Sequence, residues 1–570
     1  MGEDERTQDE NGGVVRERLL WQAATRDDVR VAQALHAGEE VDAIHELSDA
    51  GLLDGFFHFM DLTGVREEIG ALHLPGQERV LIPLVQMVLL YLLKVLVGIP
   101  SMNALPALLF SNVALMTLVG FNAHQIASGF SRRGDSHRRL RRKQGPLSPQ
   151  CLAQNVSALP AEQMEGFFNG VIRRLVAWGT VRGDVLAALD GSKLPTTKRY
   201  AGRGCLTEEH MATEKETKRK VTVVRHVFGW KVLVLIDVHT RLPLAMKVVQ
   251  IQAYEGAWLL PLVEQAQANL AGYGRITTVV IDRGYLDGED LWVLDQQGLT
   301  FVVVAKAGMV IREDALALAR GERPVERPRV VRHGRGRTAR TETLVTRLVG
   351  LEGLTTYDAY GTAEHAARKT RKDFAGHPLN AVVVQLFENR PPPGGGLVYL
   401  TNAAVRDPFV SFDTYDWRSV IENSIFKEGK YPWHLRCFPQ RTEAAVVVHC
   451  YFTLSVMALC TAFRLWQASG APEDPAPAPA RPAPAPPSSP AHLPAPAPTL
   501  STTLLGGEGT ERWRRRLKEE NRDRVIVFLG PVYGIFHLAE VAVLTGLRLK
   551  TLPPEVGTRQ AILIRFGLGP

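Results

Sequence analysis

The spacing of apolar residues changes near residue 180, and this change divides the chain into two kinds of structure. Between residues 41 and 180 apolar positions recur every three or four residues, as in IPLVQMVLLYLLKVLV and PAEQMEGFFNGVIRRLVAWG, which predicts helices. From residue 184 short apolar runs dominate, and they predict strands. Residues 1–40 are polar and are expected to be flexible. We therefore expect a mostly helical N-terminal region followed by an α/β region.

Residues 181–305 carry the clearest α/β pattern. VLAALDGSKL predicts a strand, and HVFGWKVLVLIDVHTRLPLAMKVVQ predicts two strands joined by a turn at 239–241. EGAWLLPLVEQAQANLAG then predicts an amphipathic helix, TTVVID a strand, GEDLWVLDQQ a helix and LTFVVVAKA a strand. This succession is typical of an open α/β sheet, in which ligands gather at the carboxyl ends of strands.

The rest of the chain changes character three times. Residues 306–405 contain strand-like runs separated by Gly and Pro, and they predict a β-rich insertion. Residues 406–470 return to a helical pattern. Residues 471–499 hold 12 Pro and 9 Ala in 29 positions, a composition that favours an extended linker. Residues 500–570 are expected to form a C-terminal appendage, to which the sequence assigns no role.

The composition, with 45% hydrophobic and 22% charged residues in 570, is that of a globular protein with several domains. The five cysteines form no CxxC pair, which argues against a structural zinc site or a disulfide framework and favours a reducing cytoplasm. The acidic N-terminus lacks the apolar core of a signal peptide. Residues 80–99 are nearly apolar enough for a membrane span, but Pro83, Gln86 and Lys94 interrupt them. We expect a buried helix there and no membrane partner.

Positive charge is concentrated in one run. Residues 132–143 carry seven Arg or Lys against one Asp, and they follow the helix-turn-helix-like stretch SNVALMTLVGFNAHQIASG. Such a run is either a solvated loop or an arm that grips DNA phosphates. In the second interpretation the contacting arginines are Arg138, Arg139, Arg141 and Arg142.

Three acidic residues are candidates for catalysis. Asp190 and Asp282 each end a strand-like run, and Glu422 lies in the helix-like stretch YDWRSVIENSIFKEGK. Each one alone has an ordinary interpretation as a turn, cap or surface residue. Together, such carboxylates can bind two divalent cations about 4 Å apart, which clamp the attacking and leaving oxygens of a phosphodiester. The three acids therefore predict chemistry on DNA.

Two neighbours of Glu422 add to this prediction. Tyr415, Arg418 and Glu422 are spaced three and four residues apart, so on a helix they share one face. The guanidinium of Arg418 is suited to bidentate binding of a DNA phosphate, and the Tyr415 hydroxyl can add a contact. The alternative is an ordinary intrahelical pair between Arg418 and Glu422.

These segments resemble the insertion-sequence-four type of DDE transposases over roughly residues 50–465. YDWRSVIENSIFKEGK is similar to the Tyr-Arg-Glu-Lys signature of that family, and DGSKL and IDRGYLDG resemble the segments that carry its two catalytic aspartates. The family lysine normally follows the glutamate with six residues between them. Here Gly429 occupies that position and Lys430 comes one residue later. On a continuous α-helix the side chain of Lys430 would point about 80° around the helix axis from that of Glu422. We favour Lys430 over Lys427 as the counterpart.

The resemblance implies a ribonuclease-H-like core that is interrupted by the β-rich insertion. It implies two Mg²⁺ or Mn²⁺ ions, with Asp190 bridging them and Asp282 and Glu422 each completing one site. It also implies cutting at terminal inverted repeats, joining of the 3′ ends to target DNA, and a homodimer in the synaptic complex. Some members use a tryptophan to stabilise a hairpin intermediate. Residues 306–416 contain no Trp, so the excision route stays open.

Two other functions remain compatible with the sequence: a domesticated or inactive transposase-derived DNA-binding protein, and a metal-dependent structural nuclease. The chain has no GxxxxGK[ST] loop, so we expect no nucleotide cofactor. It also has no HExxH zinc motif and no GxSxG nucleophile elbow. The expected location is the cytoplasm, in association with the nucleoid.

Overall fold

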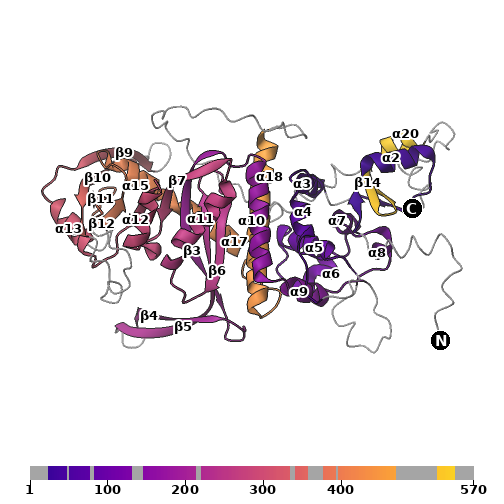
Figure 1. Cartoon of the computed structure of the whole chain (residues 1–570), viewed down its shortest axis with the longest axis horizontal. Coiled ribbons are helices and arrows are strands. Elements are labelled where there is room, and N and C mark those ends of the chain that lie inside the picture. Colours follow the sequence, from indigo (N-terminus) through magenta and orange to yellow (C-terminus); the bar gives the residue numbers. More distant parts are fainter. Residues whose placement is uncertain are drawn as a thin grey trace. The chain divides into compact units, whose positions relative to one another are not determined.

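A computed structural model of the chain describes residues 23–47, 51–76, 82–130, 146–213, 220–333, 340–356, 377–392, 396–469 and 523–545. The chain divides into two compact units (Figure 1). Unit 1 combines residues 1–174 with residues 429–570, and unit 2 comprises residues 175–428. The predicted change in pattern near residue 180 therefore coincides with a boundary between units.

The described strands of unit 2 form one ten-stranded sheet with the order β4-β5-β3-β7-β8-β12-β11-β10-β9, and β6 pairs with β5. The strands are β3 (Gly183–Thr196), β4 (Gly204–Thr213), β5 (Lys220–Asp237), β6 (Pro243–Gln250), β7 (Gly274–Ile281), β8 (Thr300–Val304), β9 (Val325–His333), β10 (Arg340–Leu354), β11 (Leu379–Leu386) and β12 (Leu397–Thr401).

The first part of this sheet follows the predicted succession. β3 pairs antiparallel with β5, and β5 pairs antiparallel with β6. Helix α11 (Leu259–Leu270) then leads to β7, and helix α12 (Gly288–Gln296) leads to β8. Because β7 and β8 are reached by these crossovers, β3, β7 and β8 run parallel. The predicted three strands, helix, strand, helix and strand are confirmed.

The sequence prediction misses one strand of unit 2. β4 pairs antiparallel with the first half of β5, which begins at Lys220 rather than near residue 226 as predicted. The hairpin of β4 and β5 projects beyond the rest of unit 2 (Figure 1). Many of its residues, such as Glu208 and Arg225, are only partly covered or exposed. A strand without a buried face lacks the apolar alternation by which strands are recognised.

Residues 306–405 are rich in strands, as predicted, and they extend the existing sheet. β12 pairs antiparallel with β8, and β11, β10 and β9 follow outward. Helix α13 (Val310–Leu318) packs against β10, β11 and β12. Leu348, Val382 and Tyr399 belong to a buried cluster that also receives Phe409 from helix α15 (Pro408–Asp416). The insertion is therefore tied to the helical segment that follows it.

Unit 1 is mainly helical. Its described helices include α3 (Gly51–Leu62), α4 (Val65–Gly70), α5 (Leu84–Leu96), α6 (Leu105–Leu108), α7 (Val113–Leu118), α8 (Ala123–Ala127), α9 (Pro149–Ser157), most of α10 (Ala161–Ala177), and α18 (Glu443–Ser469). Helix α18 packs against α3, α5 and α9. The helix-turn-helix-like stretch contains α7 and α8, which are only six and five residues long. The basic run after it lies outside the described residues.

One helix among the described residues, α18, is long and apolar enough to cross a membrane by length and composition alone. Of its apolar window, 94% is buried within the protein, as in the core helix of a globular domain. Helix α5 lies inside the apolar stretch 80–99 and is shorter, with 13 residues. Its Gln86 and Lys94 side chains are buried with the apolar residues around them.

The two ends of the chain meet in a small four-stranded sheet of unit 1. Its order is β1 (Thr25–Arg26), β14 (Val532–His537), β13 (Arg524–Leu529) and β2 (Ala43–Glu46). Helices α2 (Asp28–Ala37) and α20 (Leu538–Leu544) pack on it around Val31, Val527 and Val541. The expectation of a flexible segment up to residue 40 is wrong for residues 23–40. Residues 523–545 are likewise built into unit 1.

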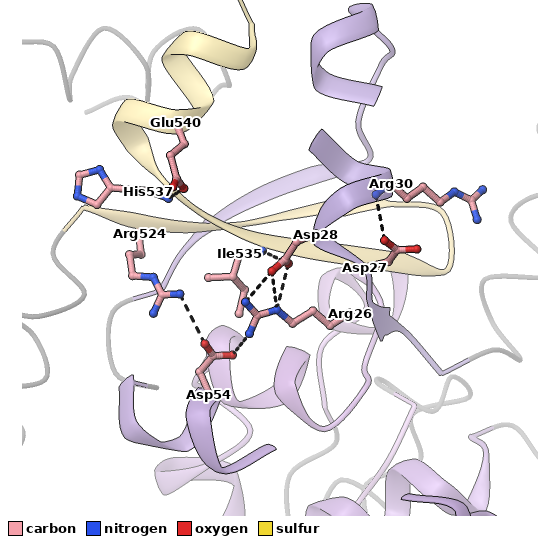
Figure 2. A network of polar contacts seen from close by, with 9 residues as sticks. All are labelled: Arg26, Asp27, Asp28, Arg30, Asp54, Arg524, Ile535, His537 and Glu540. Atoms are coloured by element: carbon pink, nitrogen blue, oxygen red, sulfur yellow. Dashed lines mark hydrogen bonds and ion pairs between the residues drawn. The ribbon is translucent and has the colours of Figure 1, made fainter. Parts of the chain in front are cut away.

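A polar network joins the two ends of the chain (Figure 2). Arg26 donates to both oxygens of Asp28 and, from Nη1, to Asp54 Oδ1 at 2.6 Å. Arg524 Nη2 lies 3.6 Å from Asp54 Oδ2, and the backbone N–H of Ile535 donates to Asp28 Oδ1 at 3.0 Å. Each of the four carboxylate oxygens therefore has a partner.

Candidate active site

The strands β3 and β7 place Asp190 and Asp282 side by side. The two strands run parallel, and Leu189 of β3 is paired with Ile281 of β7. The two aspartates are the next residues, and neighbouring strands lie about 4.8 Å apart. β7 ends at this point, whereas β3 continues to Thr196. The prediction that Asp190 ends its strand is therefore wrong, and the two aspartates lie side by side part-way along β3 and at the end of β7.

Arg418 bridges the two aspartates. Its Nη1 donates a hydrogen bond to Asp190 Oδ2 at 2.9 Å and lies 3.7 Å from Asp282 Oδ1. Arg418 is the first residue of helix α16 (Arg418–Ile421), which packs against β3. Its ion pairs are thus with the aspartates, and the guanidinium marks a place between them where positive charge is stabilised.

The environment of Asp190 favours its protonated form. Burial raises the pKa of the Asp190 carboxyl to about 7, Arg418 opposes the shift, and the negative charge of Asp282 adds to it. The backbone N–H of Gly191 donates to Asp190 Oδ1 at 2.7 Å. Near neutral pH this carboxyl is therefore poised between its two protonation states, and a further positive charge favours the ionised state.

Asp282 is held by the turn that follows β7. It caps the 3-10 helix η3 (Arg283–Tyr285), and its Oδ2 accepts the backbone N–H of Gly284 at 3.4 Å. The other oxygen, Oδ1, is the one nearest to Arg418. The cap therefore orients one oxygen of Asp282 toward the space shared with Asp190.

Tyr415 lies beside Arg418, as the helical spacing predicts. It is the penultimate residue of α15, and its ring centroid lies 5.8 Å from the guanidinium carbon of Arg418. Burial raises the pKa of the Tyr415 hydroxyl to about 12, the positive charge of Arg418 lowers it, and the two aspartates raise it. The hydroxyl therefore stays protonated at neutral pH and is available as a hydrogen-bond donor.

Glu422 stands apart from the aspartates. It begins η7 (Glu422–Lys427), a π-helical segment that directly follows α16, and it is exposed. Burial lowers the pKa of Arg418, but nearby groups that include Asp190, Asp282 and Glu422 raise it overall. Within the described part of the chain, no group of three or more His, Cys, Asp or Glu residues could hold a metal ion. The structure thus brings together Asp190, Asp282 and Arg418, and leaves Glu422 one helical turn away from Arg418.

The remaining predicted DNA contacts are not placed at this site. Lys430 lies in α17 (Glu428–Lys430), which follows η7 along the chain, and it belongs to unit 1. The arginines Arg138, Arg139, Arg141 and Arg142 lie outside the described residues. Their roles stay predictions.

The sequence that carries this site matches a known protein family. Residues 182–460 match the family model of the transposase DDE domain. Residues 182–460 are therefore similar to a transposase DDE domain, and the name DDE domain is used for this segment. The DDE domain begins one residue before β3 and ends within α18, so it includes Asp190, Asp282 and Glu422. A search among curated proteins found no significant match.

Solved structures give a more distant likeness. One chain in the cryo-EM structure of a piggyBac transposase synaptic complex with hairpin DNA matches with a TM-score of 0.37 and 10% sequence identity. The match covers 91% of this chain and 85% of that chain.

The DDE domain contains three residues beside the aspartates that sequence reasoning missed. They are Lys231, Glu255 and Tyr285. The ammonium of Lys231 donates to Glu255 Oε1 at 2.8 Å. Lys231 could have been noticed in the sequence, because its charge interrupts the apolar run of β5. Nothing in the sequence around Glu255 distinguishes that residue. Tyr285 lies within the second aspartate segment, IDRGYLDG, and could have been noticed there.

Proposed function

We propose that this chain is a DNA transposase of an insertion sequence, which cuts at terminal inverted repeats and joins the freed 3′ ends to target DNA. The proposal rests on the pair of Asp190 and Asp282, which lie side by side within a transposase DDE domain and share one cationic partner. Adjacent carboxylates on neighbouring parallel strands, near the carboxyl end of one of them, are suited to phosphodiester chemistry.

The side chains at the site fit a hard divalent cation such as Mg²⁺ or Mn²⁺. Asp190 and Asp282 offer the oxygen ligands that these ions prefer, and Arg418 shows that positive charge is stabilised between them. Asp190, Asp282 and Glu422 would hold these ions. Such ions, when bound, supply an activated water and neutralise charge on the phosphate.

The other side chains have roles of their own. Arg418 moves from the aspartates to a DNA phosphate, which its planar guanidinium can bind through two hydrogen bonds. Tyr415 keeps its proton and donates it in a hydrogen bond to the same strand. Asp190 loses the proton that burial favours, because a cation stabilises its ionised form.

The π-helical segment supports the choice of Lys430 over Lys427. A π-helical turn closes an i→i+5 hydrogen bond and so holds one residue more than an α-helical turn. Passage through η7 therefore compensates for the one-residue displacement of this lysine. The side chain of Lys430 therefore points in the direction that the side chain of residue 429 would have on an uninterrupted α-helix.

The strand order supports a ribonuclease-H-like core. The order β6-β5-β3-β7-β8 combines two antiparallel pairings with two parallel ones, and residues 306–405 then form an insertion. Because two transposon ends must be brought together, we propose a homodimer on DNA. We place its action in the cytoplasm, at the nucleoid.

One observation favours a second function, DNA binding without cleavage. Glu422 is exposed, and among the described residues no group of three or more His, Cys, Asp or Glu side chains could hold a metal ion. A protein descended from a transposase can keep its DNA contacts after losing the ability to assemble this site. The two functions differ in a single measurable property, which is strand cleavage.

The deciding experiment is a nicking assay on DNA that carries the inverted repeats flanking the gene. We expect the full chain to cut at the repeat ends with Mg²⁺ or Mn²⁺ and not with EDTA. Asp190→Asn and Glu422→Gln should bind the ends but not cut them. Asp184→Asn is the control, because Asp184 lies on the same strand in an exposed pair with Arg275. Binding of the ends without cleavage by the unmodified chain favours the second function.

A further inference from the structure

Glu255 places a further carboxylate beside the two aspartates. It directly precedes the 3-10 helix η2 (Gly256–Trp258). A Cβ atom placed on Gly284 would lie 2.6 Å from Glu255 Oε2 and 3.6 Å from Asp282 Oδ2. A Cβ atom on Gly191 would lie 3.5 Å from Glu255 Cδ. The residue after Asp190 and the second residue after Asp282 therefore lack the atoms that would crowd this carboxylate.

Lys231 fixes the position of Glu255. Its ammonium donates to Glu255 Oε1 at 2.8 Å and to the backbone carbonyl of Ala253 at 2.6 Å. The side chain of Lys231 is 9% exposed and that of Glu255 is 23% exposed. A buried ion pair adds little net stability, because the desolvation of both charges offsets their attraction. The pair therefore serves better to hold a carboxylate in place than to stabilise the fold.

Tyr285 supplies an independent observation that points to a bound group. Its side chain is fully buried, and its hydroxyl has no hydrogen-bond partner in the described structure. Its Oη lies 3.2 Å from the position of a Cβ atom on Gly191, on the side occupied by Glu255. Burial raises the pKa of the Tyr285 hydroxyl, and the charges of Glu255, Asp190 and Asp282 raise it further. A buried donor without an acceptor calls for an explanation.

The charges around this donor change when DNA binds. Asp190 and Asp282 pair with Arg418, and Glu255 pairs with Lys231. Burial lowers the pKa of nearby Lys306, and the charges of Asp282 and Glu255 oppose this shift. When Arg418 moves to DNA, as the proposed function requires, the two aspartates lose their ion-pair partner. A cation between the aspartates replaces that partner, and its hydration shell can supply the acceptor for Tyr285.

We propose that Glu255, held by Lys231, is a positioning residue of the active site and that Glu255 and Tyr285 together hold a water molecule on the cation that Asp190 and Asp282 bind. This inference rests on the proposed function. Groups that orient metal ligands from outside the coordination sphere typically change metal affinity by about 10–100-fold when they are removed.

The test measures Mn²⁺ binding to the full chain without DNA, by the loss of the free-ion electron paramagnetic resonance signal. We expect Glu255→Gln to raise the Kd for Mn²⁺ by about 10–100-fold. Tyr285→Phe, which removes only the hydroxyl, should raise it by a few-fold. Asp184→Asn should bind Mn²⁺ like the unmodified chain, because Asp184 pairs with Arg275 at the other end of β3 and β7.

A second variant guards against loss of folding in Glu255→Gln, which leaves Lys231 without its partner. Lys231→Met combined with Glu255→Gln removes both charges and should restore the melting temperature but not the Mn²⁺ affinity. Restored affinity in this double variant would overturn the inference, because Glu255 would then only balance Lys231.

Two outcomes separate this inference from the proposed function. Unchanged Mn²⁺ binding in Glu255→Gln together with lost binding in Asp190→Asn rejects the role of Glu255 and leaves the proposed metal site standing. Unchanged binding in both variants rejects the metal site itself, and the inference with it.

Discussion

Two arginines of this protein each lie between two aspartates, but their surroundings differ. In the terminal sheet, Arg26 uses three nitrogens for Asp28 and Asp54, and Arg524 adds a second positive charge (Figure 2). In the DDE domain, Arg418 contacts Asp190 and Asp282 through the single nitrogen Nη1. The carboxylates of the first cluster share two guanidinium groups, whereas those of the second share one, and their other oxygens accept backbone N–H groups from Gly191 and Gly284.

The pKa shifts in the two clusters support the same distinction between them. Burial lowers the pKa of Arg26, but its hydrogen bonds and the charges of Asp28 and Asp54 raise it overall. In the DDE domain the largest shift falls on an acid, because burial raises the pKa of Asp190 to about 7 in spite of Arg418. Breaking the first cluster is therefore expected to destabilise the fold, because it leaves a buried charge without a partner, while the second cluster, which favours the protonated acid in spite of an arginine, is suited to take up a cation.

The largest contrast is expected between Asp282→Asn and Asp28→Asn. Asp282→Asn should reduce DNA cleavage by about 1,000-fold or more, because loss of a metal ligand removes several kcal/mol of transition-state stabilisation. Asp28→Asn should leave cleavage per folded molecule unchanged and lower the melting temperature. A nicking assay together with thermal unfolding measures both effects. Equal loss of cleavage in the two variants would contradict the comparison.

Arg26→Met should lower the free energy of unfolding of unit 1 by roughly 3 kcal/mol, because it leaves the buried carboxylate of Asp54 and the partly exposed carboxylate of Asp28 short of a partner. Urea denaturation followed by tryptophan fluorescence measures this change. Arg418→Met is the matched variant, and we expect it to lower stability less, because Asp190, whose pKa burial raises to about 7, can take up a proton when Arg418 is removed. A larger loss in Arg418→Met than in Arg26→Met would reverse the assignment of the two clusters.

Arg418→Lys should reduce cleavage by about 10–100-fold while the protein stays folded. Lysine keeps the positive charge but cannot make the two parallel hydrogen bonds to a phosphate, and a hydrogen bond to a charged group contributes about 1.5–3 kcal/mol. Single-turnover cleavage with saturating DNA separates this effect from weaker binding. Cleavage at the unmodified rate would show that Arg418 serves only as a partner of the aspartates.

The smallest expected change in binding or activity is a pH dependence that arises from Asp190. Its pKa in the folded protein, about 7, lies above the ordinary value of 3.8, so the folded state binds this proton more tightly than the unfolded state. The resulting stabilisation is complete below about pH 4 and is lost as the pH rises through 7. Mn²⁺ needs the ionised form, so its apparent affinity should rise about tenfold between pH 6 and pH 8.

Asp190→Asn serves as the control for this dependence. The variant cannot ionise at this position, so its stability should not show the decline between pH 4 and pH 7 that Asp190 causes. Denaturant titrations of both proteins across this range measure the difference. Parallel pH profiles would mean that Asp190 has an ordinary pKa in the folded protein.

The sequence predicts the local part of the site well. The apolar runs of β3 and β7 identify the strands that carry Asp190 and Asp282, because buried parallel strands are nearly continuous in apolar residues. The three- and four-residue spacing places Tyr415 and Arg418 on one helical face. These features depend only on residues close together in the sequence.

The features that the sequence does not reveal depend on distant partners. Glu255 meets Lys231 only after β5 and the start of η2 have packed beside the aspartates. Both carboxylate oxygens of Asp54 are paired only because Arg26 and Arg524, which are far apart in the sequence, lie on either side of it. The π-helical segment at Glu422 has no recognisable pattern of its own, because its apolar spacing also fits an α-helix.

The terminal sheet has a consequence for the making of the protein. Its middle strands, β13 and β14, are flanked by β1 and β2, which leave the ribosome roughly 480 residues earlier. At about 5–20 residues per second, the early strands wait on the order of half a minute or longer for their partners. This sheet can therefore form only after residue 537 has been synthesised. A prematurely terminated product lacks Ile535 and Arg524, which are partners of Asp28 and Asp54.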